Sequence, residues 1–116
     1  MTRILFASLM MLALTSLNFP KNTHKALIVQ AEVEIKNVAG LDERAAAKFT
    51  QLASSYRCRV WLNYQKKRRD GKDILGILML QIKKGAMITL EIEGENEEEC
   101  FNALKALVDN KFGYKE

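Results

Sequence analysis

The stretch Gly40-Leu41-Asp42-Glu43-Arg44-Ala45-Ala46-Ala47-Lys48-Phe49 joins a predicted strand to a predicted helix. Before it, residues 32–37 alternate between polar and apolar, with Val33 and Ile35 expected to face a core. After it, apolar side chains recur every three or four residues, which is typical of one buried helix face: Ala45, Ala46, Phe49, Leu52, Ala53 and Tyr56. A half-buried strand therefore leads directly into an amphipathic helix.

The chain beyond this helix continues to alternate between strand and helix patterns. Residues 58–64 have the period of a strand, residues 65–70 form a short cation-rich edge strand, and residues 87–93 form another strand. Asp73 is placed to cap a short helix that reaches Met79, while Asn96 and Glu99 resemble a capping box before a last helix. The order β-α-β-β-α-β-α predicts an α+β fold in which three helices cover one face of a four-stranded antiparallel sheet.

The first thirty residues differ from the rest of this 116-residue chain, which has room for one compact domain. They contain three cations and no acid, whereas the remainder has 15 basic and 14 acidic residues. The apolar run from Ile4 to Leu14 has the length of a signal-peptide core and is short for a membrane span. We expect an apolar extension over residues 1–30; export, an N-terminal helix and a start codon assigned too early all remain open.

Cysteine and histidine usage argues against a metal site. Cys58 and Cys100 fall on apolar positions of predicted elements, so we expect buried thiols and not a disulfide. His24 is the only histidine and lies in the extension, and there is no cluster with the spacing of zinc ligands. The sequence therefore predicts neither a structural zinc ion nor another cofactor.

The opening stretch resembles the signature of the histidine phosphocarrier protein family, HPr, which reads Gly-Leu-His-x-Arg-Pro-Ala-x-x-Phe. Asp42 stands at the position of the phosphorylated histidine, and Ala45 at the position of a proline. Residues 71–76, Gly-Lys-Asp-Ile-Leu-Gly, resemble a second family landmark, Lys-Ser-Ile-Met-Gly, with Asp73 in place of the regulatory serine. The resemblance implies an HPr-like open-faced β-sandwich over residues 31–116.

The family's chemistry explains why the missing histidine matters. In HPr proteins, a histidine at the start of the first helix accepts a phosphoryl group from Enzyme I and passes it to sugar-specific components of the phosphotransferase system. Helix N–H groups and an arginine hold the anion, and Arg44 matches that arginine. Asp42 lacks the imidazole that forms the transferable phosphoramidate. An aspartyl phosphate is the remaining route, although the sequence shows no accompanying set of Mg²⁺ ligands.

Arg44 and Asp73 also have purely structural interpretations. Arg44 is a cation in the first turn of a helix, where the helix dipole opposes it, and Asp42 with Glu43 would supply the compensating anion. Asp73 would serve as an N-cap, as serine does. Alternatively, its fixed negative charge would imitate part of the effect of a phosphoserine.

Two surfaces are candidates for partner binding. Ile74, Leu75 and Leu78 lie where HPr proteins present an apolar patch to Enzyme I and transporter domains, and we expect at least two of them to be exposed; core packing is the alternative. The basic segment from Lys66 to Arg69, close to Trp61, would suit a nucleic-acid-binding module.

Taken with the resemblance, these features predict a cytoplasmic, non-enzymatic, HPr-like protein of the bacterial sugar phosphotransferase system. We expect it to regulate or dock to partners such as Enzyme I without being phosphorylated. A functioning or residual phosphocarrier is one alternative, and a nucleic-acid-binding module is another. Export is the alternative localisation if residues 1–30 act as a signal peptide.

Overall fold

The computed structural model describes residues 28–116, and over this range the elements follow the predicted order. They are β1 (Ile28–Glu34), α2 (Glu43–Ser54), β2 (Arg59–Tyr64), β3 (Lys67–Asp70), α3 (Ile74–Leu78), β4 (Met87–Glu93) and α4 (Glu97–Asp109), followed by the 3-10 turn η2 (Lys111–Gly113). Residues 1–27 of the predicted extension, with its apolar run and His24, lie outside the described residues. No helix within residues 28–116 is long and apolar enough to cross a bilayer.

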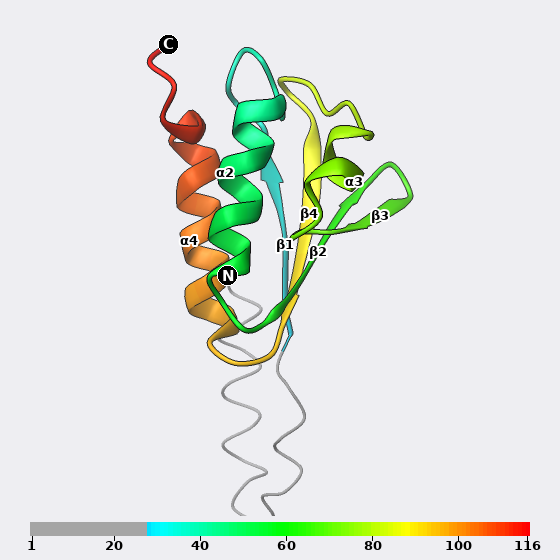
Figure 1. The fold of residues 1–116 in the computed structure, drawn as a ribbon, viewed down its shortest axis with the longest axis vertical. Helices are drawn as coiled ribbons and strands as arrows, with labels where there is room; N and C mark the ends of the chain where they lie inside the picture. Colours follow the sequence, from blue (N-terminus) through cyan, green and yellow to red (C-terminus); the bar gives the residue numbers. More distant parts are fainter. Residues whose placement is uncertain (1–27) are drawn as a thin grey trace, which may run out of the picture.

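The four strands form one antiparallel sheet with the order β1-β4-β2-β3, so β1 and β3 are its edges. Figure 1 shows α2 and α4 side by side along one face of this sheet, with α3 beside the end of β3. The other broad face carries no helix of the described chain. The predicted α+β open-faced sandwich is thereby confirmed.

The core lies between the sheet and the helices, because each element turns its apolar side chains toward that space. Alternate strand residues and the stripes of α2 and α4 are buried, among them Val33, Val60, Leu62, Ile88, Leu90, Ile92, Ala45, Phe49, Phe101, Leu104 and Val108. Cys58 and Cys100 are free, buried thiols, as predicted. Burial and the neighbouring thiol of Cys58 raise the pKa of Cys100 to about 12.

Two local predictions are wrong. The first strand runs from Ile28 to Glu34 instead of over residues 32–37, because its first half pairs with the end of β4, beginning at Ile28 opposite Glu93. Asn96 does not form a capping box, since it has left-handed backbone angles (φ 56°, ψ 34°) and its side chain caps no N–H. An N-cap side chain reaches the helix amides from extended backbone, which Asn96 does not have.

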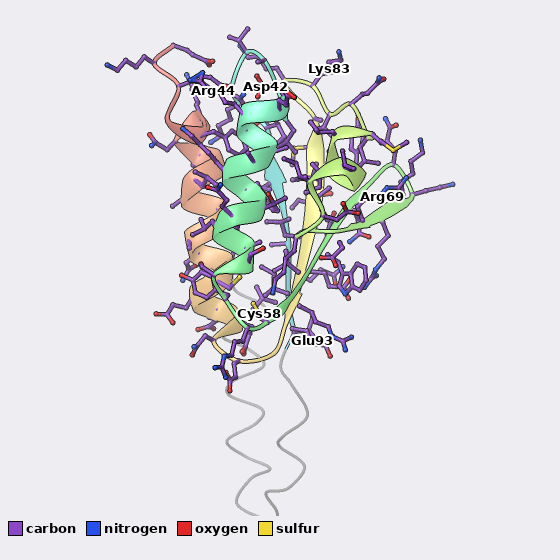
Figure 2. All side chains as sticks on the ribbon, viewed as in Figure 1. Asp42, Arg44, Cys58, Arg69, Lys83 and Glu93 are labelled. Carbon is purple, nitrogen blue, oxygen red and sulfur yellow. The ribbon has the colours of Figure 1, made fainter. Side chains whose placement is uncertain are left out.

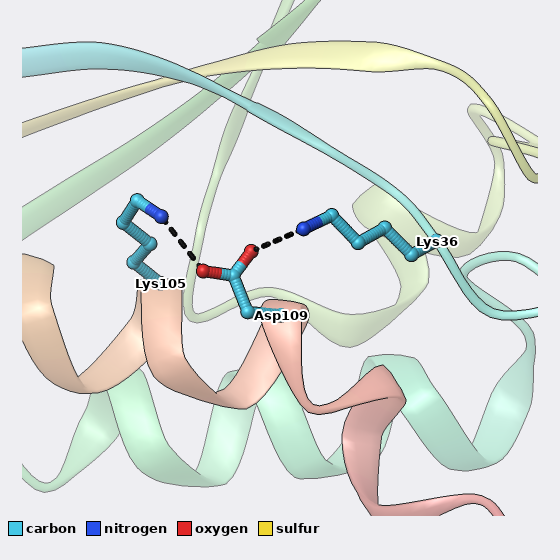
Figure 3. Close-up of polar contacts among 3 residues, drawn as sticks. All are labelled: Lys36, Lys105 and Asp109. Carbon is cyan, nitrogen blue, oxygen red and sulfur yellow. Dashed lines mark hydrogen bonds and ion pairs between the residues drawn. The ribbon is translucent and has the colours of Figure 1, made fainter.

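An ionic contact ties the end of α4 to the loop that precedes α2. The carboxylate of Asp109 lies 3.3 Å from Lys36 Nζ and 2.7 Å from Lys105 Nζ, as Figure 3 shows. The hydrogen bond from Lys105, and then that from Lys36, holds the pKa of Asp109 below its ordinary value against the opposing effect of desolvation. Asp109 therefore helps to fix the loop from which the candidate site is built.

Candidate functional site

The loop before α2 is held close to the segment that follows α3, and a glycine permits this approach. Gly40 has φ +70°, and a Cβ on it would lie 2.4 Å from the carbonyl oxygen of Ile82 and 2.8 Å from Lys83 Cα. The next amide, that of Leu41, donates to the same Ile82 oxygen at 2.9 Å. Only glycine combines this backbone angle with this lack of space. The packing fixes where the chain enters α2.

Asn37 supports the same loop from within and was missed in the sequence analysis. Its side chain is fully buried, and its Nδ2 donates to the Gly40 carbonyl oxygen at 2.7 Å. Its Oδ1 has no hydrogen-bond partner among residues 28–116. In the sequence, Asn37 continues the alternation of the inward-facing Val33 and Ile35, and a polar side chain at such a position was a signal that could have identified it.

Asp42 is the N-cap of α2, and its carboxylate is already engaged. Its backbone is extended, and its Oδ1 accepts a hydrogen bond from the Ala45 N–H at 2.9 Å. The hydroxyl of Tyr114, 72 residues later in the chain, donates to the same carboxylate at 3.0 Å from Oδ2 and 3.1 Å from Oδ1. The position that matches the phosphorylated histidine thus carries an anion bound by two donors of the chain itself.

Arg44 contacts an aromatic ring and not a carboxylate. Its Cζ lies 5.4 Å from the centre of the Tyr114 ring, a cation–π distance. Within residues 28–116 it forms no ion pair with Asp42 or Glu43, so the interpretation that these acids compensate its charge finds no direct contact to support it. The reason is geometric, because Asp42 turns its carboxylate toward Ala45 and the Tyr114 hydroxyl.

The phenol of Tyr114 lies beside both the Asp42 carboxylate and the Arg44 guanidinium. Partial desolvation raises its pKa above the ordinary value, the hydrogen bond and charge of Asp42 raise it further, and the nearby Arg44 acts in the opposite direction. Nothing in the sequence of the C-terminal tail distinguished this tyrosine as a partner of the candidate site.

The start of α2 keeps some capacity to bind an anion. Among the described residues, the backbone N–H groups of Glu43 and Arg44 have no acceptor, and they lie at the positive end of the helix dipole. The exposed guanidinium of Arg44 is beside them. Residues 28–116 contain no group of three potential metal ligands. The arrangement can hold negative charge, but Asp42 cannot form a phosphoramidate.

The second sequence-predicted site lies on α3, close to the segment that Gly40 contacts. Asp73 caps α3, since its Oδ1 accepts from the Gly76 N–H at 3.2 Å. Of the three residues expected in a docking patch, only Leu75 is exposed, at 68%, because Ile74 and Leu78 pack against the core. The expectation that at least two are exposed is therefore wrong.

Met79 completes the exposed apolar surface of α3 and was missed. It is 73% exposed and lies four residues after Leu75, at the C-cap of the helix. Leu75 and Met79 are called the apolar patch below. Figure 2 shows Asp42, Arg44 and Lys83 together at one end of the molecule, and Cys58 and Glu93 at the opposite end.

The basic segment, Lys66 to Arg69, is partly engaged in contacts within the protein. Arg68 lies over the Trp61 ring, with its Cζ 4.4 Å from the ring centre, and it forms an ion pair with Glu91 at 3.1 Å. Arg68 and one face of the Trp61 ring are therefore already engaged with each other on the surface of the sheet.

Comparison with known proteins places this geometry in a family. Residues 29–110 match the family model described as the PTS HPr component phosphorylation site, PTS being the phosphotransferase system. The phosphocarrier protein HPr of Neisseria meningitidis is 41% identical over 86 residues, which cover 74% of this chain and 97% of that protein. The HPr-like protein Crh of Bacillus subtilis is 34% identical over 84 residues, which cover 72% of this chain and 99% of that protein.

Solved structures agree with the sequence comparison. The crystal structure of an HPr protein (HPr-C-His) from Thermoanaerobacter tengcongensis superposes with a TM-score of 0.73 at 38% identity, over 76% of this chain and 99% of that chain. The fold and these comparisons define a small HPr-like domain, and the proteins of this family are phosphocarriers and not catalysts. The chain belongs to the HPr family of the phosphotransferase system.

Proposed function

We propose that this chain is a regulatory or docking member of the phosphotransferase system that does not itself carry a phosphoryl group. The observation that carries the proposal is the state of Asp42. Its carboxylate stands at the position that matches the phosphohistidine and binds the Ala45 N–H and the Tyr114 hydroxyl. A permanent anion at this helix start has the sign of charge that a phosphohistidine would bring there.

The chemistry of Asp42 supports the same proposal. An attack on a phosphoryl donor through Oδ2 would compete with the hydrogen bond that the Tyr114 hydroxyl donates to that oxygen at 3.0 Å. Acyl phosphates form at sites that collect Mg²⁺ ligands, and residues 28–116 contain no cluster of three such side chains. A residual phosphocarrier with an aspartyl phosphate is therefore the second candidate.

The docking part of the proposal rests on the apolar patch. Leu75 and Met79 are both more than two-thirds exposed at a short helix, so most of their apolar surface lies outside the core. We expect this patch to contact Enzyme I or sugar-specific components. Asp73 adds a fixed charge at the cap of the same helix, which would replace regulation by serine phosphorylation with a permanent state.

A phosphotransfer experiment tests the chemistry. The full chain and its Asp42→His and Asp42→Ala variants are incubated with phosphoenolpyruvate, Mg²⁺ and Enzyme I, and their masses are measured. We expect no phosphoryl group on the native chain and a gain on Asp42→His, because the variant restores the nucleophile on an intact docking surface. Modification of the native chain that is lost in Asp42→Ala would establish the phosphocarrier alternative instead.

A binding experiment tests the docking surface. Replacing Leu75 and Met79 together by serine should weaken Enzyme I binding by about tenfold, since this corresponds to a combined loss of about 1.4 kcal/mol of apolar burial at the interface. The matched control is Ile28→Ser, which changes a residue 53% exposed opposite Glu93, at the other end of the molecule. An equal loss in both variants contradicts a specific patch. If the native chain binds no partner, the regulatory function fails and a decayed gene copy is the better account.

The localisation is part of the same proposal. We expect the protein to meet its partners in the cytoplasm, although the predicted extension would allow export. N-terminal sequencing of the native protein in separate cytoplasmic and secreted fractions distinguishes the two, because a chain that begins after residue 30 and is found only in the secreted fraction could not meet a cytoplasmic Enzyme I.

A further inference from the structure

The last residues of the chain fold back from α4 toward the start of α2. Lys111, Phe112 and Gly113 have successive φ angles of 55°, 55° and 84°, all in the left-handed region. A turn of this kind is unfavourable for the two non-glycine residues and persists where packing determines it. The packing here is the fully buried side chain of Phe112, together with a hydrogen bond of 2.8 Å from Lys48 Nζ to the Phe112 carbonyl oxygen.

Beyond this anchor, two residues, Tyr114 and Glu116, hold the tail on the candidate site. The Tyr114 hydroxyl binds the Asp42 carboxylate, and the Tyr114 ring lies against the Arg44 guanidinium. The Glu116 carboxylate accepts a hydrogen bond from the Val38 N–H, at 3.0 Å from Oε1 and 3.3 Å from Oε2. Figure 1 shows the red C-terminal tail beside the beginning of α2. We call residues 111–116 the C-terminal strap.

The anchor and the outer part of the strap differ in stability. Phe112 is at 0% exposure, whereas Glu116 is exposed and its bond to Val38 lies on the surface. Surface contacts are weak because water competes for both partners, so they open without global unfolding. Gly113, between the two parts, accommodates the change of direction that such an opening requires.

We propose that the C-terminal strap is an autoinhibitory latch, in which Tyr114 and Glu116 close over Asp42, Arg44 and Val38 and must be released before a partner protein docks at this end. The inference rests on the proposed docking function. The latch occupies the one functional carboxylate and covers one side of the one arginine of the site. A partner that recognises these groups therefore competes with the chain's own tail.

Amide hydrogen exchange tests the latch without any partner. The Val38 amide hydrogen of the native full chain should exchange through local opening of the strap. Tyr114→Phe and Glu116→Ala should each raise its exchange rate about threefold or more. Lys115→Ala is the matched control, since Lys115 lies between the two latch residues, is exposed and makes no hydrogen bond or ion pair within residues 28–116. Unchanged Val38 exchange in both latch variants would overturn the proposal.

Binding of Enzyme I tests the inhibition. If the latch is open for about 10–30% of the time, a chain ending at Gly113 should bind about three- to tenfold more tightly than the full chain, because apparent affinity scales with the competent fraction. Tyr114→Phe should show part of this gain, and Lys115→Ala none. Equal or weaker binding by the shortened chain overturns the latch while leaving the docking function intact. Absence of binding by every variant overturns the docking function, and the inhibitory role falls with it.

Discussion

The Asp42→Ala variant measures how much the carboxylate contributes as a structural group. The change removes the acceptor of the Ala45 N–H, a bond of 2.9 Å at the N-cap of α2, and also the acceptor of the partly buried hydrogen bond from the Tyr114 hydroxyl. Loss of such a cap lowers the free energy of unfolding by about 1 kcal/mol, within a range of about 0.5–2. For a domain of this size, that corresponds to a fall in Tm of about 4–8 °C. Asp42→Asn keeps an acceptor at the cap, so we expect a loss of only a few tenths of a kcal/mol.

Urea and thermal unfolding of the three proteins, followed by circular dichroism at pH 7, provide the measurement. Amide exchange adds a local readout, because the Ala45 N–H loses its acceptor in Asp42→Ala and should exchange at least about fivefold faster, the factor that corresponds to about 1 kcal/mol. The reasoning is refuted if Asp42→Ala unfolds at the same urea concentration and the same temperature as the native chain. It is equally refuted if Asp42→Asn is as destabilised as Asp42→Ala, since the effect would then come from charge and not from the cap.

Three further predictions follow from packing and titration. Gly40→Ala should destabilise the domain by more than about 2 kcal/mol, because left-handed strain adds to a clash at 2.4 Å with the Ile82 carbonyl. Gly85→Ala, with φ +91° and no atom within 4 Å, is the matched control and should lose only about 1–2 kcal/mol in chemical unfolding. The pKa of Asp109 is lower in the folded protein than in the unfolded chain, so its ionised form stabilises the fold above the unfolded pKa. This contribution disappears as the pH falls through the folded pKa. In Asp109→Asn, the free energy of unfolding should therefore fall less steeply as the pH is lowered through the acid range. The raised pKa of Cys100 has the opposite consequence, because above pH 9.0 the unfolded chain releases its thiol proton while the folded chain keeps it up to about pH 12. The free energy of unfolding should therefore fall as the pH rises through this range. In Cys100→Ser it should fall less steeply.

Several features of the fold were accessible from local sequence patterns. The stripe that includes Phe49 and the alternation that includes Leu62 report directly on burial, because a helix repeats every 3.6 residues and a strand every two. Asp73 was identified as a cap because an N-cap acts within three residues of itself. The same reasoning failed at Asn96, where the residue type was right and the backbone angle was not.

The exposed surface of α3 could not be divided by pattern alone. Ile74, Leu75, Leu78 and Met79 are all apolar, and a helix this short has too few turns for a stripe to be unambiguous. The position of α3 against α2 and β3 decides that Leu75 and Met79 remain exposed. Such a decision depends on neighbours that are distant in the sequence.

Residue type and short-range spacing were enough to predict the order of elements, the two buried thiols and Asp42 at the position where the family keeps a histidine. The contacts of the site were not predictable in this way. Asp42 binds Tyr114, 72 residues away, and Arg44 lies against the same ring instead of an acid. The physical reason is that the return of the C-terminal tail to the start of α2 depends on the path of the whole chain around a shared core, which no local periodicity encodes.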